Sequence, residues 1–180
     1  MFDKQYRFFG SHAEKVNALT SIFDEASKAK LFDRNLDVYI NAPLVGFLFK
    51  RKGTKDKGDS SISPQNIFPE QMMNASDKLK YILRLILLLD TSYEPNAEKR
   101  LDRAFRYDAN PEKAEELQEC IDNFNSYVRG GIEYMYSLFT TGCTSRYDYI
   151  RAAFAATRDF KEEINGVSYE KEIKRLLNKG

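Results

Sequence analysis

Hydrophobic residues recur every three or four positions along most of the chain, which is the spacing of one face of an α-helix. Ser11 and Glu14 form a capping-box pattern where the first helix begins. Asn110 followed by Pro111 gives an N-cap residue and a proline at the first helical position of the longest one. The pattern predicts helices over residues 12–31, 69–90, 96–106, 111–139 and 146–165, and a short C-terminal helix that opens at Ser168.

Residues 36–49 fit two kinds of structure. Their β-branched and aromatic residues favour a strand. Residues 38, 42, 45, 46 and 49, however, lie at helical spacing, and no second strand-like segment is present to pair with them. We therefore predict a helix that holds Pro43 near its first turn or at a kink.

The whole pattern predicts an all-α fold, a single-domain helical bundle of about six or seven helices over residues 1–180. An aromatic N-terminal arm at 1–10 and a mobile, basic and serine-rich loop at 50–66 complete it. Gly130 and Gly131 lie inside the longest predicted helix, at a cost of roughly 1 kcal/mol each relative to alanine. We expect them to allow a close approach of the helix that carries Gly46; a kink is the alternative.

Composition excludes several classes of protein. The 180 residues include 28 basic and 27 acidic side chains and are 42% hydrophobic, which is too apolar for a disordered chain and too balanced for an unspecific nucleic-acid binder. The longest apolar run, 81–89, is broken by Arg84 and is too short to cross a membrane, and the N-terminus is unlike a signal peptide. With only Cys120 and Cys143, we expect a reduced, cytoplasmic protein that does not contact membranes.

The common catalytic motifs are missing from the sequence. His12 is the only histidine, and with two distant cysteines it cannot make a typical zinc site or a nucleophilic triad. Neither a phosphate-binding loop nor a nucleophile elbow is present, and the carboxylates of Glu115, Glu116 and Glu119 lie opposite the apolar stripe of their helix. We therefore expect no enzyme activity, no catalytic residue, no cofactor and no metal.

Two groups of basic residues are the first candidates for a binding surface. If the fold brings them together, they could contact a nucleic-acid backbone or an acidic partner. Ordinary solvated charge is the alternative reading. The first group lies in the 50–57 segment and the second in the 99–106 helix: Lys50, Arg51, Lys52, Lys55 and Lys57, then Lys99, Arg100, Arg103 and Arg106.

Aromatic residues are the second candidate. The chain has eleven tyrosines and thirteen phenylalanines, more than the predicted core stripes accommodate. Tyr134 and Tyr147 are left over, and large amphipathic rings of this kind suit a protein–protein surface. Partial burial and a homodimer closed by the N-terminal arm are the alternatives.

Four segments together resemble a small family of accessory proteins encoded beside bacterial DNA-phosphorothioation (Dnd) and related anti-phage systems. They are residues 37–52, 66–70, the leucine-rich helix that ends at Asp90, and 124–134, so the resemblance covers residues 36–140. It implies a context, bacterial defence against foreign DNA, rather than a mechanism. We therefore expect a non-enzymatic adaptor that docks onto larger partners in such an assembly. Direct binding to a nucleic-acid backbone through 50–57 and 99–106 is the alternative.

Overall fold

The structure, a computed structural model, describes residues 1–56 and 61–166. This part of the chain is mostly helical, with two short two-stranded sheets. The α-helices are α1 Gly10–Thr20, α2 Asn35–Leu48, α3 Pro69–Asn74, α4 Ser76–Leu89, α5 Ala97–Phe105, α6 Ala114–Thr140 and α7 Arg146–Gly166. The strands are β1 Tyr6–Phe8, β2 Ile22–Asp24, β3 Ala29–Lys30 and β4 Gln65–Ile67, and the 3-10 turns are Tyr107–Ala109 and Pro111–Lys113.

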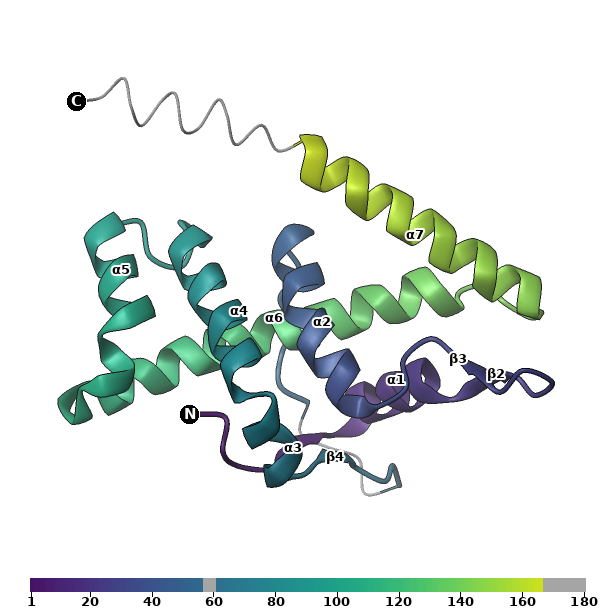
Figure 1. Ribbon diagram of the computed structural model, residues 1–180, viewed down its shortest axis with the longest axis horizontal. Coiled ribbons are helices and arrows are strands. Elements are labelled where there is room, and N and C mark those ends of the chain that lie inside the picture. Colours follow the sequence, from purple (N-terminus) through teal and green to yellow (C-terminus); the bar gives the residue numbers. More distant parts are fainter. Residues whose placement is uncertain (57–60, 167–180) are drawn as a thin grey trace.

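Helix α6 runs the length of the molecule, and the other elements are arranged along it (Figure 1). Helix α2 makes the most extensive contact with it, α4 and α5 stand side by side towards one end, and α7 turns back from the other end. The prediction of a helix at 36–49 is confirmed by α2, which contains Pro43. Pro43 lies inside α2 rather than near its first turn, so the helix lacks the hydrogen bond that an amide at this position would donate to the carbonyl oxygen of Tyr39.

The backbones of α2 and α6 meet at glycines. A Cβ atom built on Gly131 would overlap the carbonyl group of Ala42, with 2.6 Å to its carbon. One built on Gly46 would lie 3.0 Å from the carbonyl carbon of Tyr127 in the same way. On either side of this crossing, Tyr39 and Phe124 are fully buried and pack edge to face. The glycines therefore set how closely the two central helices can approach.

The N-terminal arm is part of the core. Strand β1 pairs antiparallel with β4, with Arg7 opposite Asn66, and Phe2 and Phe8 are buried against the α2–α6 pair. The prediction of an all-α fold is wrong in this detail. A three-residue strand carries too short a pattern to be read, and its partner lies almost sixty residues away.

The first predicted helix is wrong in its second half. Helix α1 ends at Thr20, and residues 22–30 form the β2–β3 hairpin instead of continuing to residue 31. The hydroxyl of Ser21 donates to the carbonyl oxygen of Asn17 at 2.6 Å, so it competes with the helical hydrogen bonds at this point. The predicted capping box is also absent, because the amide of Ser11 donates to Asp56 Oδ2 at 2.8 Å.

Three other boundaries differ from the predicted ones. The helix expected at 69–90 is broken at Ala75 into α3 and α4. Asn110 caps the Pro111–Lys113 3-10 turn, and α6 follows from Ala114. Ser145 caps α7: the amide of Asp148 donates to the hydroxyl of Ser145, and the amide of Ser145 donates to the carboxylate of Asp148. The predicted helix after Ser168 lies outside the described residues.

Candidate functional site

The first part of the 50–66 segment, which we expected to be a mobile loop, packs against α6. Gly53 is buried, and its amide donates to the carbonyl oxygen of Ser126 at 2.8 Å. Arg129 Nε donates to the carbonyl oxygen of Gly53 at 2.9 Å, and Asp56 reaches the first turn of α1. Residues 50–56 are therefore fixed at both ends, and the predicted cation Lys57 lies outside the described residues.

A buried carboxylate holds the first basic group in place. Asp90, at the end of α4, is 3% exposed and accepts hydrogen bonds from the hydroxyl of Tyr127 at 2.7 Å and the amide of Asn123 at 3.3 Å. Lys52 Nζ lies 3.5 Å from the same carboxylate and 4.6 Å from the centre of the Tyr127 ring. Lys52 is thus engaged inside the protein rather than offered to a ligand.

Hydrogen bonds hold Asp90 in its charged form. Burial acts to raise the pKa of Asp90, but hydrogen bonds from Ser92, Tyr127 and Asn123, together with the charge of Lys52, lower it below its ordinary value. The same burial and the bond to Asp90 raise the pKa of Tyr127. A carboxylate supplied with this many donors is a structural hub, since it joins the end of α4 to Asn123 and Tyr127 of α6 and to Lys52.

Arg100 and Arg103 of the second basic group turn inward, whereas Lys99 and Arg106 are exposed. Arg100 donates to the carbonyl oxygens of Leu88, Glu94 and Pro95, each at 2.9 Å. The spacing of Leu101 and Phe105 predicts that they face the core, but they are about half exposed at 50% and 51%. The helix turns this way because the polar 88–95 segment needs donors and the guanidinium supplies them.

Arg103 belongs to a second polar cluster. Its guanidinium lies 5.2 Å from the centre of the Tyr93 ring, 3.6 Å from a carboxylate oxygen of Glu94 and 3.6 Å from Cys120 Sγ. Burial raises the pKa of Tyr93 to about 12, and burial also raises the pKa of the Cys120 thiol. Neither group is primed for nucleophilic chemistry, because a reactive cysteine needs a lowered pKa.

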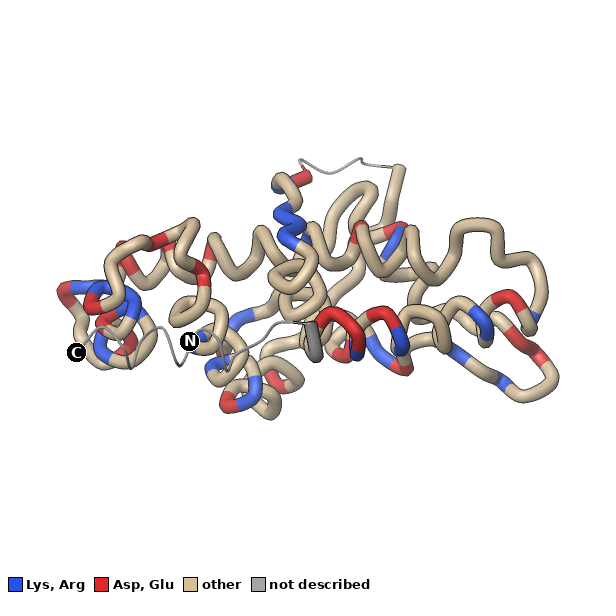
Figure 2. Tube along the Cα trace, turned by 90° about the horizontal axis from the view of Figure 1, so that it is seen from above, with Lys and Arg blue, Asp and Glu red and all other residues tan. Residues whose placement is uncertain are grey.

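The structure does bring the two basic groups together, but not as a free surface. Lys52 and Arg103 both lie near the Tyr93 ring, and each already has an acidic neighbour. Arg106 pairs with Asp102, whereas Lys50, Arg51, Lys55 and Lys99 are exposed and make no ion pair within the described residues. Basic and acidic positions are interspersed along the trace (Figure 2). Over residues 1–56 and 61–166 this arrangement does not form the basic stripe that is typical of a surface that binds a phosphate backbone.

The two tyrosines singled out by the sequence differ in exposure. Tyr134 stacks on Phe49 with 4.6 Å between ring centres, and the Arg51 guanidinium covers it at 5.8 Å. Tyr147, in contrast, is 78% exposed at the start of α7. Only Tyr147 is open to a partner.

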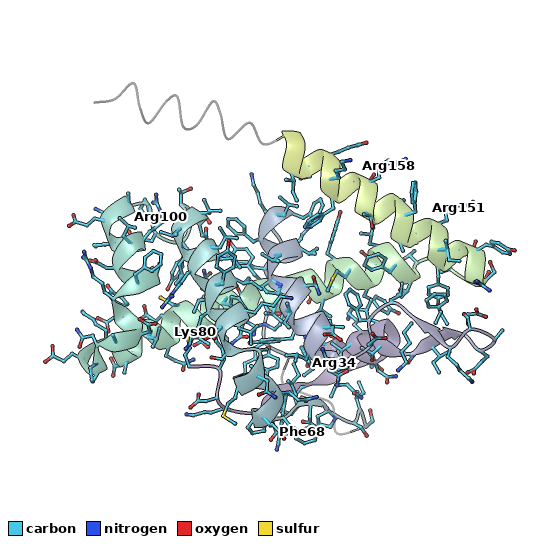
Figure 3. The ribbon with its side chains drawn as sticks, viewed as in Figure 1. Arg34, Phe68, Lys80, Arg100, Arg151 and Arg158 are labelled. Atoms are coloured by element: carbon cyan, nitrogen blue, oxygen red, sulfur yellow. The ribbon has the colours of Figure 1, made fainter. Side chains whose placement is uncertain are left out.

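The outer face of α7 is a site that the sequence analysis missed. Ile150 and Phe154 follow Tyr147 at helical spacing and are 48% and 73% exposed. Arg151 and Arg158 lie on the same face, away from α6 (Figure 3). The helical spacing of Ile150 and Phe154 predicts a buried stripe, but the sequence alone does not tell which side of an amphipathic helix is covered. We call Tyr147, Ile150 and Phe154 the α7 apolar face.

The single histidine is part of the α1–α6 contact. His12 is 5% exposed, and its Nε2 lies 2.9 Å from Glu133 Oε1. Burial lowers the pKa of His12, while the hydrogen bond and charge of Glu133 act in the opposite direction. Lys15 and Asp56 contribute smaller opposing effects.

This pKa shift predicts acid destabilisation. Because the folded protein holds His12 below its ordinary pKa of about 6.5, the unfolded chain binds more protons as the pH falls through that value. We expect the thermal unfolding midpoint, followed by circular dichroism, to be lower at about pH 5.5 than at about pH 7.5. His12→Gln should flatten the dependence in this window. An unchanged pH profile in His12→Gln would assign the effect to other groups.

Metal and membrane sites were sought in the described residues as well. No group of three or more His, Cys, Asp or Glu side chains among residues 1–56 and 61–166 lies close enough to hold a metal ion. None of the helices in that part of the chain combines the length and the apolar character needed to cross a membrane.

Comparison with known proteins identifies no relative of this chain. No protein-family model matches the chain, and neither a curated protein nor a solved structure is detectably similar to it. The functional argument therefore depends on the chain's own geometry.

Proposed function

We propose that the protein is a non-enzymatic adaptor that docks a larger protein partner on the α7 apolar face, within a bacterial DNA-linked or phage-defence assembly. The exposure of Tyr147, Ile150 and Phe154 on one helical face is the observation that carries the proposal. Contiguous exposed apolar side chains commonly mark interaction surfaces, and aromatic residues dominate their binding energy. The defence context comes from the resemblance of residues 36–140.

The chemistry of the face indicates its partner. Three apolar side chains provide anchors, and Arg151 and Arg158 flank them on the outer side. Arg158 already pairs with Asp159, so Arg151 is the cation with most freedom to meet an acidic group. The matching surface is an apolar groove or amphipathic helix with an acidic rim.

Truncation of the central anchor tests the proposal. Tagged chain is purified from its host with the products of neighbouring genes, and the complex is then rebuilt from purified components. We expect Phe154→Ser to weaken the rebuilt complex at least about tenfold by calorimetry, as for an aromatic hot spot. Tyr81→Ser on α4 is the matched control, because Tyr81 is also an exposed aromatic, at 69%.

Salt separates this function from nucleic-acid binding. An apolar interface should change little in affinity between low salt and about 0.5 M salt, whereas contacts to several phosphates would be lost by orders of magnitude. Equal binding by Phe154→Ser and the unaltered chain would rule out the α7 apolar face. If the captured component were nucleic acid and its affinity fell steeply with salt, nucleic-acid binding, the alternative function, would be favoured over the adaptor function.

A further inference from the structure

A second, chemically different site is a hollow of about 560 Å³. Strand β1, the start of α1, residues 55–56 and the middle of α6 form its walls. Its volume lies within the range of roughly 300–1,000 Å³ that small-molecule pockets occupy. The lining includes three cations from three separate segments: Arg7, Lys55 and Arg129.

Arg129 is the best-positioned of these cations. Its Nε is fixed on the carbonyl oxygen of Gly53, which is itself held on α6 through the Ser126 carbonyl. Among the described residues, no carboxylate pairs with its guanidinium within ion-pair distance. Its charge still acts on the buried Tyr6 hydroxyl, since burial raises the pKa of Tyr6 and Arg129 opposes that rise. A half-buried guanidinium with a fixed position and no acidic partner favours an anionic ligand.

The lining holds two acidic residues, Asp56 and Asp122, against its three cations, so the cations are in excess. Asp56 Oδ2 accepts the amide of Ser11 at 2.8 Å, so this carboxylate is committed to the first turn of α1. Asp122 is exposed and accepts from the amide of Gln118 at 3.1 Å. Both acids therefore have protein donors of their own.

Neutral groups in the hollow add directional contacts. The hydroxyl of Tyr39 donates to Asn125 Oδ1 at 2.9 Å, which leaves the Asn125 amide nitrogen as a donor towards the hollow. Phe9 lies at the edge with 38% of its surface exposed and offers a ring face. An anion bound to Arg129 and a planar group packed on Phe9 would together occupy the hollow.

We propose that this hollow binds a small phosphomonoester that carries a planar ring, of the size of a nucleoside monophosphate. The phosphate lies on the Arg129 guanidinium, with Lys55 and the Asn125 amide as further donors, and the ring packs on Phe9. Guanidinium and phosphate match as two-pronged hydrogen-bonding partners, which makes Arg129 the group that selects the phosphate. The site is independent of the α7 apolar face.

Calorimetry with AMP, adenosine and inorganic phosphate tests the proposal on the full chain. We expect AMP to bind with one-to-one stoichiometry, adenosine to bind at least about tenfold more weakly, and phosphate to compete with AMP. Arg129→Gln should weaken AMP at least about tenfold, while Arg151→Gln on α7 leaves it unchanged.

Circular dichroism shows whether each variant is folded. If Arg129→Gln loses its fold through the broken bond to Gly53, the exposed Lys55→Gln and Phe9→Ala variants carry the test, each with an expected loss of about threefold or more in AMP affinity. Absence of AMP binding, equal binding of AMP and adenosine, or full affinity in all folded variants would each overturn the proposal.

Discussion

Gly131→Ala is expected to lower the free energy of unfolding by about 3 kcal/mol, although alanine is the better helix former by roughly 1 kcal/mol. Gly131 lies inside α6 where that helix crosses α2, and the added methyl group would overlap the carbonyl of Ala42. Because the methyl group would overlap backbone atoms of Ala42, a rotation of side chains cannot relieve the overlap. The two central helices would have to separate, which would loosen the contact that the rest of the core depends on.

Ser137→Ala is the matched control for this experiment. Ser137 is exposed on the same helix, and its hydroxyl donates to the carbonyl oxygen of Tyr134 within the helix. We expect this variant to differ from the unaltered chain by less than about 0.5 kcal/mol in urea unfolding. If Gly131→Ala were as stable as Ser137→Ala, the close crossing of α2 and α6 would be wrong.

The sequence predicts the long central elements because their patterns persist over many turns. Helix α6 repeats its apolar residues for seven turns of chain, and α2 keeps helical spacing despite its strand-like composition. Local signals also suffice at the start of α7, where Ser145 and Asp148 are close in sequence. What the sequence could not predict depends on distant segments.

The errors have a common physical origin. Strand β1 forms only because β4 pairs with it, and α1 begins where Asp56 meets it from a later loop. On α5, charge alone suggested that Arg100 faces water, but the carbonyl oxygens of the 88–95 segment accept its hydrogen bonds. Non-local hydrogen-bond partners therefore overruled the amphipathic pattern.

The candidate sites show the same limit. Exposure of Phe154 and the hollow around Arg129 both depend on which neighbours the fold supplies, and no motif marks either position. The sequence presents Asp90 as the last residue of a leucine-rich helix, yet it joins three segments of the chain. A polar residue that ends a strongly apolar helix was the only signal available for it.

Asp90→Asn is expected to lower the free energy of unfolding by about 3–5 kcal/mol, the usual cost of removing one partner from a buried charged network. The substitution keeps the shape but leaves Lys52 without its buried counter-charge and places an NH₂ group where Tyr127 and Asn123 donate. Urea unfolding measures the loss. Asp102→Asn, which breaks the exposed pair with Arg106, is the control, with an expected change below about 0.5 kcal/mol.

The pH dependence of the same hub gives an independent check. Because the folded protein holds the pKa of Asp90 below its ordinary value of 3.8, its contribution is fully present above that value and is lost as the pH falls further, through the lower folded pKa. Asp90→Asn should therefore remove part of the stability loss seen below about pH 4 while leaving unchanged the loss due to His12, which begins at a higher pH. If Asp90→Asn unfolded with the stability of Asp102→Asn, Asp90 would not be the hub that joins the 52–53 segment, α4 and α6.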